Sequence, residues 1–188
     1  MSGWMELFDR VHGCTNCHLC EARTNAVPGE GNPNAVCMFI GEGPGADEDR
    51  QGRPFVGASG QLLDELLAEV GISRSDIYIA NIVKCRPPMN RTPFPEEANA
   101  CLPYLREQFR LIRPKVLVLL GGTAARYTIG EEVRIRRDHG RWVLRKGIWM
   151  MPTYHPSALL RDESQLPDAR SDFASVKEKL TELATCNS

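Results

Sequence analysis

The stretch that decides the fold is Lys115-Val116-Leu117-Val118-Leu119-Leu120, which is followed directly by Gly121-Gly122-Thr123. The run is short, almost entirely apolar and rich in branched side chains, and it stops at glycine, which is typical of a strand buried on both faces of a parallel sheet. Residues 122–127 then fit a short helix. A buried strand followed at once by a helix is the repeating unit of α/β folds.

The same pattern recurs along the chain. Apolar runs occupy residues 35–40, 77–80 and, less regularly, 148–152. Helical patterns occupy residues 59–70, 95–112 and 168–184. Strands that alternate with helices predict right-handed βαβ connections, so we expect an α/β fold of three layers with a central, mostly parallel four-stranded sheet flanked by helices. Ligands bind such sheets beyond the carboxyl ends of the strands, which makes the residues after each strand the candidates for a site.

Length and composition indicate one globular unit. A chain of 188 residues suits a single domain over 1–188, and 42% hydrophobic with 25% charged residues is ordinary for such a protein. The sequence contains no run of 18 apolar residues, and its start lacks the basic and apolar stretches of a secretory signal. We therefore expect a cytoplasmic protein with no membrane partner.

The charge pattern restricts how the chain could bind nucleic acid. A formal net charge of −1 excludes a polybasic coat, so any such contact needs a local basic patch. Residues 134–146 contain five arginines and one lysine. This segment fits either a DNA-contacting patch or a solvated surface hairpin.

The seven cysteines are an odd number in a chain without an export signal, which disfavours a disulfide scaffold and favours metal or cluster ligation. Cys14 and Cys17 form a C-x₂-C pair, and Cys85 and Cys101 form a wider pair. Two such pairs can enclose a zinc ion or an iron–sulfur cluster, and spacing alone does not separate the two. Cys20 could replace one ligand. The other two cysteines are expected to be a core thiol and a free thiol in the C-terminal tail, Cys37 and Cys186 respectively.

Glycines and a carboxylate follow the first predicted strand. Residues 41–49 read Gly-Glu-Gly-Pro-Gly-Ala-Asp-Glu-Asp, and residues 52–57 read Gly-Arg-Pro-Phe-Val-Gly. The segment lacks the lysine of a P-loop and the spacing of a dinucleotide site. Glu42 at the strand end and Phe55 further on suit a pocket that holds a flat ring beside an acid, although a glycine-rich turn with a core phenylalanine is the simpler interpretation. Asp47 and Glu48 are reserve acids, for which a solvated turn is favoured.

Two other strand ends carry polar side chains. Asn81 follows the second run, and its amide offers a donor and an acceptor that match the N3–H and O4 edge of uracil, although an asparagine there is more often a turn residue. His155 follows the fourth run, and Pro156 fixes the direction of the chain after it. Leu159 and Leu160 come next, in what we expect to be an exposed loop, and they suit a wedge inserted into a base stack.

Taken together, these segments resemble the uracil-DNA glycosylase superfamily, and most of all its family 4, the iron–sulfur type. The resemblance extends from Cys14 to about residue 180 and rests on the order and spacing of all the motifs rather than on any single one. It implies a DNA repair enzyme that flips uracil out of the helix and hydrolyses its N-glycosidic bond, which leaves an abasic site and initiates base excision repair. It also implies a monomer that acts on single- and double-stranded DNA, and a structural 4Fe–4S cluster held by Cys14, Cys17, Cys85 and Cys101.

The resemblance also implies roles for the other residues. Phe55 stacks on the flipped uracil, Asn81 reads its edge, and His155 donates to O2 as negative charge builds on the departing base. Glu42 is the candidate for positioning the attacking water and stabilising the sugar cation. Gly41 and Gly43 belong to the base site. The DNA-contacting residues are expected to be Ser157 and Arg161 at phosphates, Gly122 at another phosphate, and Leu159 in the gap left by the base.

Several alternatives remain open from the sequence. His139 follows Arg136-Arg137-Asp138 in a basic loop, and a related branch of the superfamily traps its product through such a histidine; the following residues 140–142 favour ordinary hydrolysis. A DNA-binding module without chemistry would leave Glu42, Asn81 and His155 without a joint purpose. An electron carrier would have no use for Phe55. A glycosylase for hypoxanthine or another deaminated base differs from these only in pocket shape.

Overall fold

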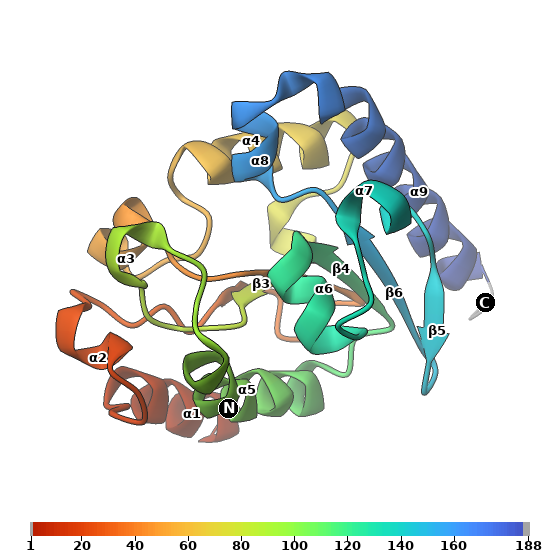
Figure 1. Ribbon diagram of the computed structural model, residues 1–188. Coiled ribbons are helices and arrows are strands. Elements are labelled where there is room, and N and C mark those ends of the chain that lie inside the picture. The colour runs from red at the N-terminus through yellow and green to blue at the C-terminus, as the bar shows by residue number, and fades with distance from the viewer. Residues whose placement is uncertain (1, 186–188) are drawn as a thin grey trace.

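The computed structural model describes residues 2–185, and a six-stranded mixed sheet forms its centre, with strand order β1-β3-β2-β4-β6-β5 (Figure 1). The four inner strands are parallel to one another: β3 Tyr78–Asn81, β2 Cys37–Gly41, β4 Val116–Leu120 and β6 Ile148–Thr153. Short antiparallel strands complete the two edges, β1 Glu30–Gly31 beside β3 and β5 Val143–Arg145 beside β6.

The expected four-stranded sheet is therefore wrong in its strand count. The two additional strands have two and three residues, which is too short for any periodicity to register in the sequence. They exist because an edge strand offers unpaired backbone groups to whatever segment lies alongside it.

Helices cover both faces of the sheet (Figure 1). One face packs against α1 Ser2–His12, α5 Pro95–Ile112 and α6 Gly122–Thr128, and the other packs against α4 Ala58–Glu69, α8 Pro156–Arg161 and α9 Leu166–Thr185. Three short α-helices lie in the connections, α2 Leu19–Ala22, α3 Ala46–Gln51 and α7 Ile135–Asp138. Single 3₁₀ turns are formed by η1 Arg74–Asp76, η2 Pro88–Asn90 and η3 Glu163–Gln165. The sequence patterns gave no indication of α1.

Alternate residues of the inner strands feed two separate cores, as the period of two in a strand requires. In β2, Met38 and Ile40 join the core beneath α1 and α5, whereas Cys37 and Phe39 join the core beneath α4 and α9. Cys37 is 2% exposed, which confirms the predicted core thiol, and burial raises its pKa well above the usual range. Cys186 lies outside the described residues.

The register of the parallel strands positions the site. Gly41 pairs with Asn81, and Leu120 pairs with Thr153, so the carboxyl ends of all four inner strands lie along one edge of the sheet. No helix within residues 2–185 combines the length and the apolar character needed to cross a membrane.

Candidate active site

A cavity of about 160 Å³ opens where β2 and β3 end, and we call it the base cavity. Its lining includes six of the predicted site residues, Glu42, Gly43, Phe55, Asn81, His155 and Ser157. Gly41 lies directly behind it, because a Cβ added there would be 2.4 Å from Asn81 Oδ1 and 2.6 Å from Phe55 Cζ. A side chain at position 41 would therefore displace both residues.

Asn81 is the most unusual polar side chain of the cavity. It is 1% exposed, and its Oδ1 atom is buried without a hydrogen-bond partner among residues 2–185. A buried acceptor left unpaired costs about 1–3 kcal/mol, so its presence in a cavity calls for an explanation. This oxygen is available to a ligand that donates an N–H.

Phe55 supplies an apolar wall. It is 6% exposed, its ring centroid lies 5.7 Å from that of His155, and the two planes are inclined by 33°. Its backbone has φ 51°, in the left-handed region that residues other than glycine seldom adopt. A ring held in this way can stack on a flat ligand.

The structure determines which nitrogen of His155 carries a proton. The Ser157 backbone N–H donates to His155 Nδ1 at 3.1 Å, and the Ser157 hydroxyl lies 2.8 Å from the same nitrogen. A backbone N–H can only donate, so Nδ1 is an acceptor and the proton of the neutral ring is on Nε2. Burial, assisted by the charge of Arg161, lowers the pKa of His155 to about 4, so the ring is neutral at pH 7.

Glu42 is oriented by a residue from another strand end. The Thr123 hydroxyl, in the first turn of α6, donates to Glu42 Oε2. Glu42 lines both the base cavity and the larger cavity beside it. Its carboxylate therefore lies at the border between the two cavities.

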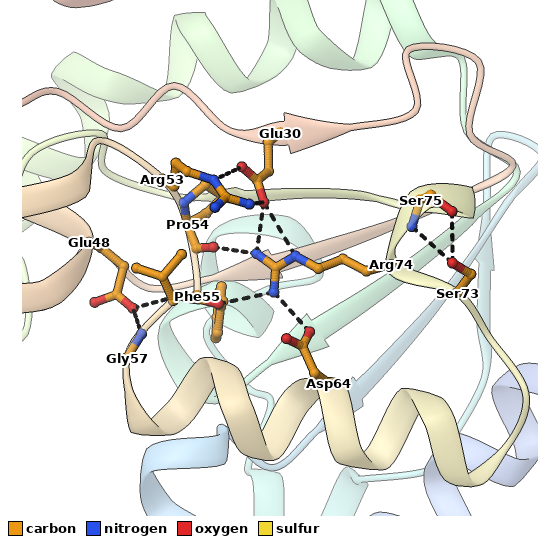
Figure 2. Close-up of polar contacts among 11 residues, drawn as sticks. Glu30, Glu48, Arg53, Pro54, Phe55, Gly57, Asp64, Ser73, Arg74 and Ser75 are labelled. Carbon is orange, nitrogen blue, oxygen red and sulfur yellow. Dashed lines mark hydrogen bonds and ion pairs between the residues drawn. The ribbon is translucent and has the colours of Figure 1, made fainter.

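Glu48, one of the two reserve acids, accepts hydrogen bonds from backbone N–H groups. It is buried, and its Oε1 accepts the backbone N–H groups of Val56 and Gly57, each at 2.9 Å (Figure 2). Its Oε2 accepts the Gly45 N–H at 3.1 Å. Three backbone donors engage both carboxylate oxygens, so Glu48 ties the two glycine-rich segments together.

The larger cavity has a volume of about 640 Å³ and we call it the basic cavity. Gly122, Ser157 and Arg161, all predicted to contact DNA, line it together with Arg126 and Arg136. The two cavities share Glu42, Asn90, His155 and Ser157 in their linings. Of the six basic residues in 134–146, Arg136 alone belongs to the described lining, so most of that segment faces elsewhere.

The prediction that both leucines of the His155 loop are exposed is wrong for Leu159. Pro156 begins α8 here, and a helix turns one side of this segment inward. Leu159 is consequently 1% exposed and packs in the core beneath α4 and α9, whereas Leu160 is 48% exposed.

His139 is engaged away from the base cavity. Its Nδ1 lies 3.1 Å from both carboxylate oxygens of Asp172, and its ring lies 4.8 Å from that of Tyr154. The Thr153 hydroxyl donates to the same carboxylate at 2.6 Å. Burial raises the pKa of Asp172 even though Thr153 and His139 both donate to it. His139 is absent from the described linings of the base and basic cavities.

Five cysteines surround a third cavity, which we call the cysteine cavity: Cys14, Cys17, Cys20, Cys85 and Cys101. Arg23 Nη1 donates to Cys85 Sγ at 3.0 Å, and the Lys84 backbone N–H donates to Cys101 Sγ at 3.2 Å. Burial raises the pKa of Cys101 to about 11. Within residues 2–185, no three or more His, Cys, Asp or Glu side chains converge in an arrangement that could hold a metal ion.

Lys84 is a buried cation that the sequence analysis missed. It is 1% exposed, and its Nζ donates to the Asn81 carbonyl at 2.9 Å and to Gln108 Oε1 at 2.8 Å. Burial lowers its pKa to about 8. The available signal was a single charge in the otherwise apolar run Ile82-Val83-Lys84-Cys85, which joins the base cavity to the cysteine cavity.

Comparison with known proteins agrees with this geometry. Residues 28–181 match the uracil DNA glycosylase superfamily. The type-4 uracil-DNA glycosylase of Thermotoga maritima is 51% identical over 160 residues, which cover 83% of this chain and 82% of that protein. The type-4 enzyme of Sulfurisphaera tokodaii is 42% identical over 187 residues, covering 95% and 85%. The type-5 uracil-DNA glycosylase of Pyrobaculum aerophilum is 37% identical over 191 residues, covering 84% of each chain. The chain belongs to the uracil-DNA glycosylase superfamily, and its relatives at 41–51% identity place it in the type-4 branch.

Proposed function

We propose that this chain acts as one domain over residues 1–188 to flip uracil out of DNA and hydrolyse its N-glycosidic bond, which leaves an abasic site and initiates base excision repair. The observation that carries the proposal is the unpaired Oδ1 of buried Asn81 in the base cavity. Uracil carries a hydrogen on N3 and can donate it to this oxygen. Cytosine has no hydrogen on N3 and cannot form that hydrogen bond.

Base recognition would combine hydrogen bonds from the Asn81 amide with stacking on the Phe55 ring. The Asn81 amide N–H donates to uracil O4 while Oδ1 accepts from N3–H, and the Phe55 ring covers one face of the base. Gly41 and Gly43 provide space, since a Cβ at Gly41 would collide with both Asn81 and Phe55. Flipping costs a few kcal/mol, and these contacts offset that cost only for a base that pairs with the amide.

Bond cleavage would use the neutral His155 ring. Its Nε2–H donates to uracil O2, and that hydrogen bond strengthens as the leaving base gains negative charge. A neutral donor suits a pocket whose burial holds the pKa of His155 at about 4. Ser157, through its N–H to Nδ1, positions the ring for this task.

Glu42 would act on the attacking water and on the sugar. Its carboxylate, oriented by Thr123, positions a water for attack on C1′ and stabilises the positive charge that develops on the sugar. The overlap of the base cavity and the basic cavity at Glu42 supports this location.

The DNA backbone would bind in the basic cavity. Ser157 and Arg161 contact phosphates beside the flipped nucleotide, and the backbone at Gly122 contacts another. Exposed Leu160, rather than buried Leu159, would fill the gap left by the base.

Cys14, Cys17, Cys85 and Cys101 would hold a 4Fe–4S cluster, with Cys20 as the alternative to one of them. The donor set fits this group, because all five sulfurs line one cavity and N–H donors from Arg23 and Lys84 point at two of them. When bound, the cluster would tie together the loops that carry its ligands. These include the loop that follows Asn81, the last residue of β3.

The deciding experiment incubates the protein with a DNA strand containing one uracil, then applies alkali and a denaturing gel. We expect a break at the uracil that is absent from a thymine control and from the Glu42→Ala, Asn81→Ala double variant. Retained DNA binding without a break would instead indicate a binding module or another damaged base. The same assay on duplex substrate tests activity on both forms of DNA, and gel filtration tests the expected monomer.

The cluster is tested on the purified protein directly. We expect a brown preparation containing iron and sulfide. A colourless preparation loaded with zinc would contradict the proposal.

A further inference from the structure

The backbone at Phe55 is held in an unfavourable conformation by side chains from neighbouring segments. A phenylalanine at φ 51° persists only where its surroundings hold it there. The adjacent amides of Val56 and Gly57 are held by Glu48. The carbonyl groups on the other side of the same turn have a partner of their own.

Arg74 is that partner. Its Nη1 donates to the Phe55 carbonyl at 3.0 Å, and its Nη2 donates to the Pro54 carbonyl (Figure 2). The planar fork of a guanidinium can engage two successive carbonyls at once, which the single ammonium of a lysine cannot reproduce. Arg74 is not among the described lining residues of the base cavity, so its effect on a bound base must pass through Phe55.

Two carboxylates from different elements hold the guanidinium. Glu30 of β1 accepts from Arg74 Nε at 3.3 Å and from Nη2 at 3.1 Å, and Asp64 of α4 accepts from Nη1 at 2.9 Å. Arg53 pairs with Glu30 from the other side, at 2.8 and 3.0 Å. The Arg74 side chain is 23% exposed, so these pairs are shielded more than ordinary surface ion pairs.

The helix α4 lies close against the same turn. A Cβ added to Gly60 would lie 1.9 Å from the Phe55 carbonyl oxygen, so a glycine is required for this approach. The turn is therefore enclosed by α4, by Glu48 and by Arg74, and Arg74 is the only one of the three that reaches back to the edge strand β1 through Glu30.

We propose that Arg74, anchored by Glu30, is a positioning residue that holds the Phe55 ring in place to stack on the flipped base. The inference rests on the proposed stacking role of Phe55. It assigns a function to the edge strand β1, because Glu30 connects that strand to base recognition.

The test measures single-turnover uracil excision and inhibition by free uracil for Arg74→Lys, Phe55→Ala and the double variant. Arg170→Lys is the matched control, because Arg170 also forms a two-pronged pair with a carboxylate of α4, Glu69, at 2.9 and 3.1 Å. We expect Arg74→Lys to slow excision about 10-fold and to weaken inhibition by uracil by a similar factor, since a small displacement of a positioning group is costly. Arg170→Lys should change either value by less than about twofold.

The double variant separates positioning from general damage. In the Phe55→Ala background, Arg74→Lys should slow excision by less than about twofold, because the ring that it positions is gone. A merely structural role would slow excision equally in both backgrounds, and that result would overturn the inference. If Arg74→Lys fails to fold, Glu30→Gln replaces it and is judged by the same criterion.

Failure of the inference differs from failure of the stacking proposal. If Phe55→Ala excises uracil at the parent rate, stacking itself is rejected. If Phe55→Ala is slow but Arg74→Lys matches Arg170→Lys, stacking stands and the role of Arg74 is rejected.

Discussion

The base cavity and the cysteine cavity lie at the two ends of one short segment, yet they are prepared for their ligands in different ways. In the base cavity, hydrogen bonds within the protein orient the two side chains that we propose for catalysis. Ser157 orients His155, and Thr123 orients Glu42. In the cysteine cavity, five sulfurs line the space without converging. The side chains of the first cavity are held by the protein itself, whereas in the second the proposed cluster would join the sulfurs.

This difference predicts that damage to the two sites will have different consequences. A change in the base cavity should lower activity and leave stability nearly intact, because the groups there serve the substrate. A change in the cysteine cavity should lower stability first, because a bound cluster would hold loops from distant parts of the chain. Lys84 lies between the two, with its Nζ on the Asn81 carbonyl and its N–H on Cys101.

The largest effect is expected in the base cavity. Asn81→Ala should slow uracil excision by about 10²–10³-fold, because it removes the paired donor and acceptor that read the base. Single-turnover assays measure the rate, with Asn34→Ala as the control for an exposed asparagine. Iron content and melting temperature should stay at the parent values, and a large fall in either would contradict the independence of the two sites.

The corresponding change in the cysteine cavity is Cys101→Ala. It should release most of the iron and lower the melting temperature by about 10 °C or more, because the proposed cluster would bind only to the folded chain. Cys37→Ala is the matched control, since Cys37 is also buried but belongs to the apolar core beneath α4 and α9. Iron loss in the control, or full iron retention in Cys101→Ala, would reject the proposed ligand set.

A smaller effect on the excision rate is expected at Leu160, the residue proposed to fill the gap left by the flipped base. Leu160→Ala should slow excision from duplex DNA about 10-fold with little change in stability, because Leu160 is exposed. Leu159→Ala should do the reverse, lowering stability by about 2–5 kcal/mol through a cavity in the core. Thermal melts and duplex assays on both variants distinguish the two residues, and a stable but slow Leu159→Ala would restore the original assignment of the wedge.

The smallest effect is a pH dependence of stability. The folded pKa of His155 is about 4, below the ordinary value near 6.5, so between these pH values the unfolded chain binds more protons than the folded one. Stability should therefore rise as pH increases from about 4 to about 6.5, and His155→Gln should remove that contribution. Melting temperatures at about pH 5 and pH 7.5 measure it, with His12→Gln as the control for an exposed histidine. An unchanged pH dependence in His155→Gln would mean that the ring is not held neutral by burial.

Sequence patterns located residues whose position follows from the local chain. Asn81 and His155 each lie at or just beyond the carboxyl end of a buried strand, and parallel strands end at one edge of the sheet. Patterns failed where a role depends on a partner far away in the chain. Arg74 lies 19 residues from Phe55 and 44 from Glu30, and Lys84 lies 24 from Gln108, so no local pattern could connect them. The inward direction of Leu159 depends on the helical turn that begins at Pro156, and no hydrophobic run in the sequence indicates that turn.

The sequence by itself therefore determined the α/β class, the parallel strands and the identity of the motif residues, because hydrophobic periodicity and strand-end chemistry are local properties. Only the tertiary structure decided the tautomer of His155, the burial of Leu159 and the restraint of Phe55 by Arg74. Each of these depends on which atoms lie within about 3 Å across the folded chain, and such distances arise only when separate elements pack together.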